Sequence, residues 1–203
     1  ALPILTSMLL GNMASDDADA GGEDPGDVTS FQDIAKLKHI PSNENLRLPY
    51  GVFYKAIMLA NKALAKLPDI PKKDPEASPA AINQMIAEVK ALRALNTFQL
   101  IQIYGEVPLV DHVLGSSEFI QPRAKMKDLF DFIEKDLKEA IEVLPVSYDA
   151  ENVGRITKGA AMAILAKAYL FASSYARNYP GDARFAGLTE RWADALAMAE
   201  NVI

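Results

Sequence analysis

The stretch from Ala91 to Val110, ALRALNTFQLIQIYGEVPLV, constrains this chain more than any other part of it. It is apolar almost throughout until Gly105, and Pro108 behind that glycine cannot extend a helix. A helix that lies on a surface shows one apolar stripe, whereas here apolar residues fall on nearly every side. The sequence therefore predicts a helix with neighbours on more than one side.

The rest of the chain predicts an all-α protein. Apolar residues recur at helical spacing in five segments, and no strand-like alternation lasts more than a few residues. Pro49 is expected in the first helical position, while Ser78 and Thr157 are expected caps. We expect more than half of the chain to be helical, with helices near residues 49–67, 79–104, 126–144, 157–174 and 189–203.

These helices are expected to form pairs, one over residues 79–144 and one over 157–203. In each pair the first helix is rich in small residues and carries an aromatic residue near its end, Phe98 or Tyr169. Small residues let paired helices approach closely, as in tetratricopeptide repeats, although the loops here are longer and more irregular. The predicted organisation is a single tetratricopeptide-like domain over 1–203, with the helix from Ala91 between its partner and the next pair.

Charge is distributed unevenly along the chain. Residues 1–35 contain seven acidic and no basic residues, while the remainder is nearly balanced and the net charge is −6. Because no basic face is apparent, nucleic acid is not expected as a partner. No apolar run reaches the roughly 20 residues that a membrane span needs. The opening ALPILTSMLL lacks the basic start of a signal peptide, so it is expected to end a helix that begins earlier.

Three segments together resemble the SusD/RagB family, the outer-membrane nutrient-binding lipoproteins of Bacteroidetes. They are EVKALRALNTFQLIQIYGEVPLV (Glu88 to Val110), the segment from Gln121 to Pro145 that begins QPRA and ends DLKEAIEVLP, and GRITKGAAMAILAKAYL (Gly154 to Leu170). The helix WADALAMAENVI also fits the order of the family's helices. The resemblance extends over roughly residues 12–203.

The resemblance implies a non-catalytic protein at the cell surface that captures a glycan, or in some members a peptide. It implies a SusC-like TonB-dependent transporter as partner, no cofactor, and attachment to the outer membrane through a lipid anchor outside this sequence. Family members are considerably longer, so this chain is expected to be a fragment. The resemblance also implies a structural role for Arg93, which would hydrogen-bond a loop across its helix.

Candidate ligand-binding residues lie in two loops near the start of the chain. In the acidic loop SDDADAGGEDPGD, Asp17 and Asp19 could accept hydrogen bonds from sugar hydroxyls. A calcium loop is not supported, because Gly21 and Val28 occupy positions that should carry oxygen ligands. Solvation alone is the alternative for this loop, and cation binding stays open.

The second loop, KHIPSNENLRLPY, offers planar amides, a guanidinium and an aromatic ring at Asn43, Asn45, Arg47 and Tyr50. The only Trp, Trp192, is expected to lie in a helix and to pack in the protein core. His39 and His112 are expected to be plain surface or packing residues, so no metal site and no catalytic residue is predicted.

Two further functions remain as alternatives to glycan capture. The chain could belong to a peptide-binding member of the same family, or it could be a generic tetratricopeptide scaffold for a partner protein. A metal-dependent hydrolase built on the acidic loop is a third and more distant alternative. The sequence leaves open which sugar or peptide would be bound and which transporter would be the partner.

Overall fold

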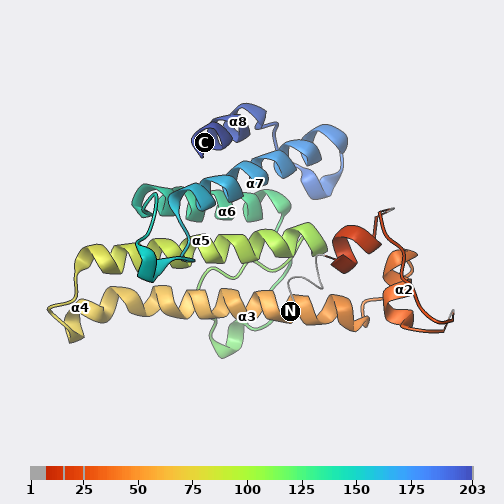
Figure 1. Ribbon diagram of the computed structural model, residues 1–203, viewed down its shortest axis with the longest axis horizontal. Helices are drawn as coiled ribbons and strands as arrows, with labels where there is room; N and C mark the ends of the chain where they lie inside the picture. Colours follow the sequence, from red (N-terminus) through yellow and green to blue (C-terminus); the bar gives the residue numbers. More distant parts are fainter. Residues whose placement is uncertain (1–7, 16, 25, 203) are drawn as a thin grey trace. The chain divides into compact units, whose positions relative to one another are not determined.

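The protein is described from a computed structural model, which covers residues 8–15, 17–24 and 26–202 (Figure 1). It is 65% helical, and the described residues contain no strand, so the predicted all-α class is confirmed. None of the described helices combines the length and apolarity required to cross a bilayer. The main elements are a π-helix at Met8–Met13 and helices α2 (Thr29–Ala35), α3 (Glu44–Lys66), α4 (Ile70–Lys73), α5 (Pro79–Tyr104), α6 (Met126–Val143), α7 (Lys158–Asn178) and α8 (Trp192–Glu200).

The chain divides into two compact units, Ala1–Lys55 and Ala56–Ile203, with α3 beginning in the first unit and ending in the second. The expectation of a single domain over 1–203 therefore stays a prediction.

In the second unit, α5 packs against α6, α6 against α7, and α7 against α8 (Figure 1). This confirms the predicted pairing of helices. The start of α5 is capped by Ser78, whose Oγ accepts from Ala81 N at 3.4 Å, and α7 is capped by Thr157 in the same way at 3.2 Å. Gly105 ends α5 with a φ of 68°, a value that a residue with a side chain adopts only under strain.

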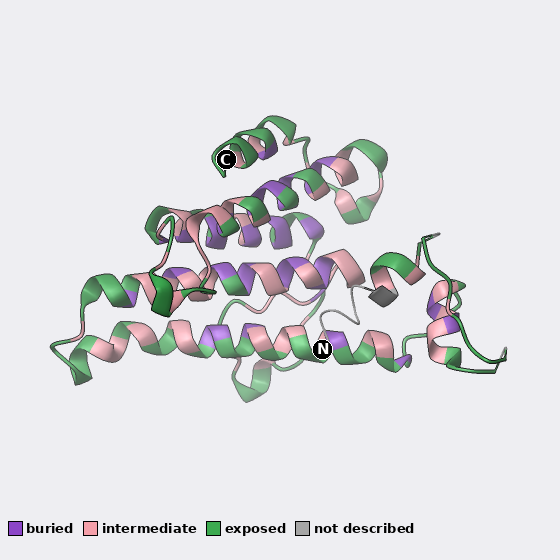
Figure 2. Cartoon of the chain, in the orientation of Figure 1, coloured by how far each residue is buried: buried purple, intermediate pink, exposed green. Residues whose placement is uncertain are grey.

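The core of this unit gathers along α5, α6 and α7, where Figure 2 shows the buried residues in purple. Small side chains at Ala91, Ala94 and Ala161 are fully buried, which allows the helix backbones to approach closely. The helix α5 packs chiefly against α6 and touches α7 far less, with the Phe98 and Phe171 rings 5.4 Å apart. The predicted burial of α5 is confirmed by nine buried positions, namely Ile82, Ala87, Ala91, Arg93, Ala94, Thr97, Phe98, Leu100 and Ile101. Its predicted place between its partner and the next pair is wrong, because it is α6 that packs against both α5 and α7.

The predicted start of α3 is wrong. The helix begins at Glu44 and not at Pro49, which lies inside it. Asn43 provides the start signal, because its Oδ1 accepts a hydrogen bond from Asn45 N at 3.0 Å and satisfies an otherwise unpaired amide.

Other elements differ from the predictions in smaller ways. The short helices α2 and α4 lie outside the five segments predicted to be helical, and α8 is shorter than predicted at both ends. Trp192 is 38% exposed at the first position of α8, because the buried face of that helix centres on Ala195. Most of the ALPILTSMLL segment lies outside the described residues.

Candidate ligand-binding site

The acidic loop of the first unit contains two kinds of carboxylate. Asp24 Oδ1 accepts from Gly26 N at 2.6 Å and Asp27 Oδ2 accepts from Glu23 N at 3.2 Å, so these two groups shape the loop. The predicted ligand residues Asp17 and Asp19 are instead exposed to solvent. Their carboxylates therefore lie where a hydroxyl-rich ligand could reach them.

The structure brings Asn43 and Asn45 together at Ser30. Asn43 Nδ2 donates to the Ser30 carbonyl at 2.9 Å, and Asn45 Nδ2 donates to Ser30 Oγ at 3.1 Å. Asn43 is only 8% exposed, and its amide oxygen also caps α3. These contacts tie the start of α3 to α2. Contact of Asn43 or Asn45 with a ligand stays a prediction, and Asn43 would have to give up structural hydrogen bonds to make it.

Arg47 and Tyr50 lie on the first turns of α3. Arg47 Nη2 donates to Glu44 Oε1 at 3.0 Å in an exposed ion pair, which contributes little to stability. The Tyr50 ring is 4.8 Å from the Tyr54 ring, with an interplanar angle of 53°. Burial, followed by the neighbouring Tyr50, raises the pKa of Tyr54. The i,i+4 spacing could have revealed Tyr54 in the sequence. Both rings are half-buried and packed against each other, so only the remaining accessible part of Tyr50 could contact a sugar.

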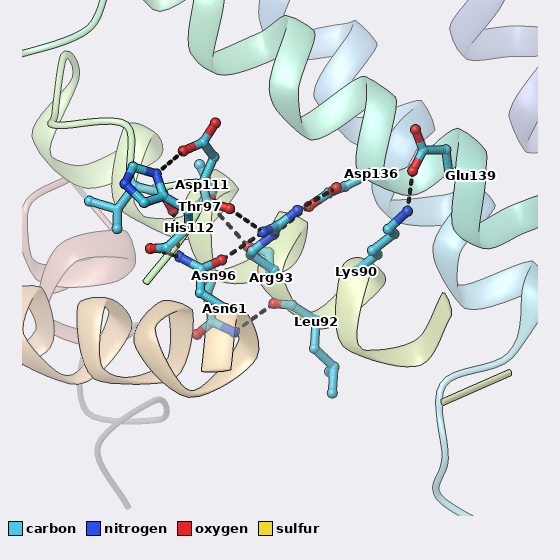
Figure 3. Close-up of polar contacts among 11 residues, drawn as sticks. Asn61, Lys90, Leu92, Arg93, Asn96, Thr97, Asp111, His112, Asp136 and Glu139 are labelled. Atoms are coloured by element: carbon cyan, nitrogen blue, oxygen red, sulfur yellow. Dashed lines mark hydrogen bonds and ion pairs between the residues drawn. The ribbon is translucent and has the colours of Figure 1, made fainter. Parts of the chain in front are cut away.

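A different polar cluster lies in the core of the second unit, where Arg93 is the central residue (Figure 3). Its guanidinium donates to both carboxylate oxygens of Asp136 on α6, at 2.7 and 2.8 Å. It also donates to Asn61 Oδ1 at 2.6 Å and to the carbonyl of Asp111 at 2.8 Å. Burial raises the pKa of the Asp136 carboxyl, and the charge of Arg93 opposes that rise.

This cluster anchors the irregular segment between α5 and α6. Asn61 Nδ2 donates to the carbonyls of Val110 and His112, at 2.9 Å each, on either side of the carbonyl that Arg93 holds. Arg93 is 7% exposed and Asp136 is 2% exposed, so the cluster has a structural role and is no ligand site. The expectation that Arg93 hydrogen-bonds a loop across its helix is confirmed.

His112 forms part of an exposed ion-pair group in the same segment. Its Nδ1 lies 2.7 Å from Asp111 Oδ1, and its Nε2 lies 3.2 Å from Glu118 Oε1. Hydrogen bonds with these two carboxylates raise the pKa of His112. His39 is exposed in the first unit. Over the described ranges, no three His, Asp or Glu side chains are placed so as to hold a metal ion.

The second unit consists of paired helices with a long connection that buried side chains anchor. The first unit carries an exposed polar loop. The profile of the SusD-like family described as "Starch-binding associating with outer membrane" matches residues 10–170. That range is most of the chain, so the protein belongs to the SusD-like family.

Individual relatives agree with this assignment. A SusD-like protein of Bacteroides ovatus is 32% identical over 134 residues, covering 66% of this chain and 24% of the relative. Another from Formosa agariphila is 31% identical over 117 residues, covering 57% of this chain and 22% of the relative. The chain therefore spans about a quarter of the length of these curated relatives.

Solved structures give the same result for the fold. A laminarin-binding SusD-like protein superposes with a TM-score of 0.80 and 32% identity, covering 98% of this chain and 38% of that one. A SusD superfamily protein from Parabacteroides distasonis superposes with a TM-score of 0.71 and 27% identity, covering 99% of this chain and 38% of that one.

Proposed function

We propose that this chain belongs to a non-catalytic glycan-binding subunit of an outer-membrane uptake complex. The observation that carries the proposal is the match of residues 10–170 to a family described as starch-binding and associated with the outer membrane. The likeness to a laminarin-binding protein, at 32% identity over nearly the whole chain, favours a glycan over a peptide as ligand.

The exposed part of the first unit supplies suitable groups for such a ligand. Carboxylates at Asp17 and Asp19 accept hydrogen bonds from sugar hydroxyls, and the Arg47 guanidinium donates them. The Tyr50 ring offers a face against which the C–H groups of a pyranose can pack. Asn43 and Asn45 would support these groups through their contacts with Ser30.

The proposal includes a partner and a location. A SusC-like TonB-dependent transporter would receive the captured glycan, and a lipid anchor outside this sequence would hold the protein on the cell surface. Both follow from the family and not from a contact in this structure. Co-purification of the full-length protein with the outer-membrane proteins encoded beside it would test the transporter as partner.

Binding is tested by screening the protein against a glycan array and then measuring affinities by calorimetry. Laminarin oligosaccharides are the first ligands to try, with starch oligosaccharides and peptides as comparisons. Tyr50→Ala should lower the affinity for the bound glycan about tenfold, since aromatic anchors commonly contribute more than about 1 kcal/mol. Asp17→Ala and Arg47→Ala should each lower it by a smaller factor.

The matched control is Glu142→Ala, which removes an exposed carboxylate from the second unit and should leave the affinity unchanged. Binding of peptides without glycans would favour a peptide-binding member of the family. Hydrolysis of a glycan during the titration would contradict the non-catalytic assignment, and failure to bind any glycan would contradict the proposal as a whole.

A further inference from the structure

The end of α7 and the turn after it carry a group of aromatic side chains that the proposed site does not use. Tyr175 stacks on Phe185 with ring centroids 4.6 Å apart and an interplanar angle of 12°. The Tyr179 ring lies 5.3 Å from the Phe185 ring and is 50% exposed. Tyr175 lies in the last turn of α7, while Tyr179 and Phe185 lie in the connection that leads from α7 to α8, and all three belong to the second unit. Figure 1 shows this connection between the two helices.

Two separate cavities lie next to the stacked Tyr175 and Phe185 rings, and each ring lines one of them. One, of about 330 Å³, is lined by Tyr179, Asp182 and Phe185 together with the small residues between them. The other, of about 360 Å³, includes Tyr175 itself and Trp192 in its lining. The two cavities share no lining residue, but Tyr175 of the second cavity stacks on Phe185 of the first and lies 6.4 Å from the Tyr179 ring, so the two cavities are neighbours with aromatic rings between them.

The rim of the first cavity carries a planar charged pair. Arg184 Nε lies 3.1 Å from each carboxylate oxygen of Asp182, and Arg184 Nη2 lies 2.6 Å from Oδ2. Asp182 Oδ1 also accepts from Arg184 N at 2.9 Å, so the turn itself sets the position of the pair. Hydrogen bonds from Arg184 lower the pKa of Asp182, which keeps the pair ionised and its net charge at zero at neutral pH.

We propose that this surface, lined by Phe171, Tyr175, Tyr179, Asp182, Phe185 and Trp192, is a second glycan-binding site. Aromatic faces take up the C–H side of a pyranose, while carboxylate and guanidinium edges bind vicinal hydroxyls. A concave apolar surface with a few convergent polar groups is the usual composition of a ligand site. The inference rests on the proposed function, because it assumes a glycan as ligand.

The arrangement favours an extended oligosaccharide over a single sugar. A single sugar fills only one cavity, whereas a longer chain can pass Tyr175 and contact both Tyr179 and Trp192. The affinity for an oligosaccharide that reaches both cavities should therefore exceed the affinity for one that fills a single cavity, because its second contact forms within the same complex.

Trp192 provides a direct measurement, since it is the only tryptophan in the chain and lines the second cavity. Titration with laminarin oligosaccharides of increasing length should change its emission and protect it from acrylamide quenching. Tyr179→Ala should weaken the binding that this signal reports about tenfold, equivalent to about 1.4 kcal/mol. Arg184→Met should weaken it less while leaving the aromatic rings in place, and it serves as a second variant if Tyr179→Ala folds poorly.

Phe119→Ala is the matched control, because it removes an exposed ring, even more accessible than Tyr179 at 70% exposed, from the segment between α5 and α6. It should leave the Trp192 signal unchanged. Glycan binding seen by calorimetry without any change at Trp192, and unaffected by Tyr179→Ala and Arg184→Met, would overturn the second site and leave the proposed function intact. A Trp192 response to a leucine-rich peptide and to no glycan would overturn the glycan as its ligand. Absence of any glycan binding by calorimetry would overturn both proposals.

Discussion

The acidic loop of the first unit, described at residues 15, 17–24, 26 and 27, and the connection between α5 and α6, residues 105–125, are both polar and irregular, yet they are held in different ways. Within the acidic loop the contacts are local, such as Gly26 N to Asp24 Oδ1 and Glu23 N to Asp27 Oδ2. The longer connection is held by buried side chains of two helices, Asn61 and Arg93, which are 18 to 51 residues away from their partners in it.

This difference in contacts shows which interactions stabilise each segment. Local side-chain contacts in solvent form and break singly, and each contributes little. The buried cluster around Arg93 joins three helices and the connection in a low-dielectric interior. There an unpaired polar group costs much more free energy than the loss of an exposed contact. We therefore expect substitutions in the cluster to affect folding and substitutions in the acidic loop to affect binding.

The largest effect is expected for Arg93→Met. It leaves Asp136 as a buried charge without its partner, and removing one member of a buried pair typically costs about 3–5 kcal/mol. Urea denaturation monitored by circular dichroism measures the loss. The control is Arg47→Met, which breaks an exposed pair and should cost less than about 1 kcal/mol. Equal losses in the two variants would contradict the distinction between the anchored connection and the exposed loops.

A smaller loss is expected for Ala161→Leu. Ala161 is fully buried in α7, so the added methyl groups must displace neighbouring helices at a cost of about 1–3 kcal/mol. Ala163→Leu on the same helix is the control, since Ala163 is exposed and the change should stay within about 0.5 kcal/mol. If both variants melt like the parent protein, close packing of α7 is less important than the buried residues indicate.

Acid should lower the folding stability of the second unit through protonation of Glu134. Burial raises the pKa of this carboxyl, but hydrogen bonds from Lys138, Arg191 and Tyr169 prevail and lower it to about 2 from its ordinary 4.5. A lowered folded-state pKa means that the stabilisation is fully present above pH 4.5 and is lost as the pH falls towards 2.

Because Glu134 is partly exposed, we expect this contribution to be about 1–2 kcal/mol. Glu134→Gln should lower stability at pH 7 by that amount and should remove the matching part of the acid dependence. Denaturant titrations at pH 7, 4 and 3 give the measurement. A variant that keeps the full acid dependence of the parent would show that other carboxyls are responsible.

The smallest effect on stability is expected for Asp17→Ala and Asp19→Ala. Both residues are exposed, and such changes usually stay within about 0.5 kcal/mol. If they contact ligand, glycan affinity should fall while the melting curve stays where it was. A loss of stability comparable to that of Arg93→Met would show that the acidic loop is a structural element.

The sequence predicted those features that depend on neighbouring residues. The bounds of α5 follow from Ser78, Pro79 and Gly105, and the structure places that helix at Pro79–Tyr104 as predicted. Thr157 caps α7 as predicted. These signals act within a few residues of the helix end, so they can be recognised without any knowledge of the fold.

Features that depend on distant residues could not be predicted in this way. The helix α2 is preceded by Val28 and followed by Leu37, which adopt φ values of 45° and 54°, and no sequence rule places a branched residue there. The partners of Arg93 at Asn61 and Asp136 come from 32 and 43 positions away, so only the fold brings them together. The aromatic residues near Tyr179 are different, because Phe171, Tyr175 and Tyr179 recur at i,i+4 and could have been recognised in the sequence. Only the stacking of Phe185 on Tyr175 depends on the turn after α7.

The anchoring of the connection between α5 and α6 has a consequence for how this chain could vary. Arg93 and Asn61 bind carbonyl oxygens at positions 110, 111 and 112, and every amino acid carries a carbonyl oxygen. The anchorage is therefore indifferent to which side chains those three positions bear. The connection can thus exchange the residues that it presents to solvent while its path stays the same. It is a natural place to diversify this chain by library selection without redesigning the helices beneath it.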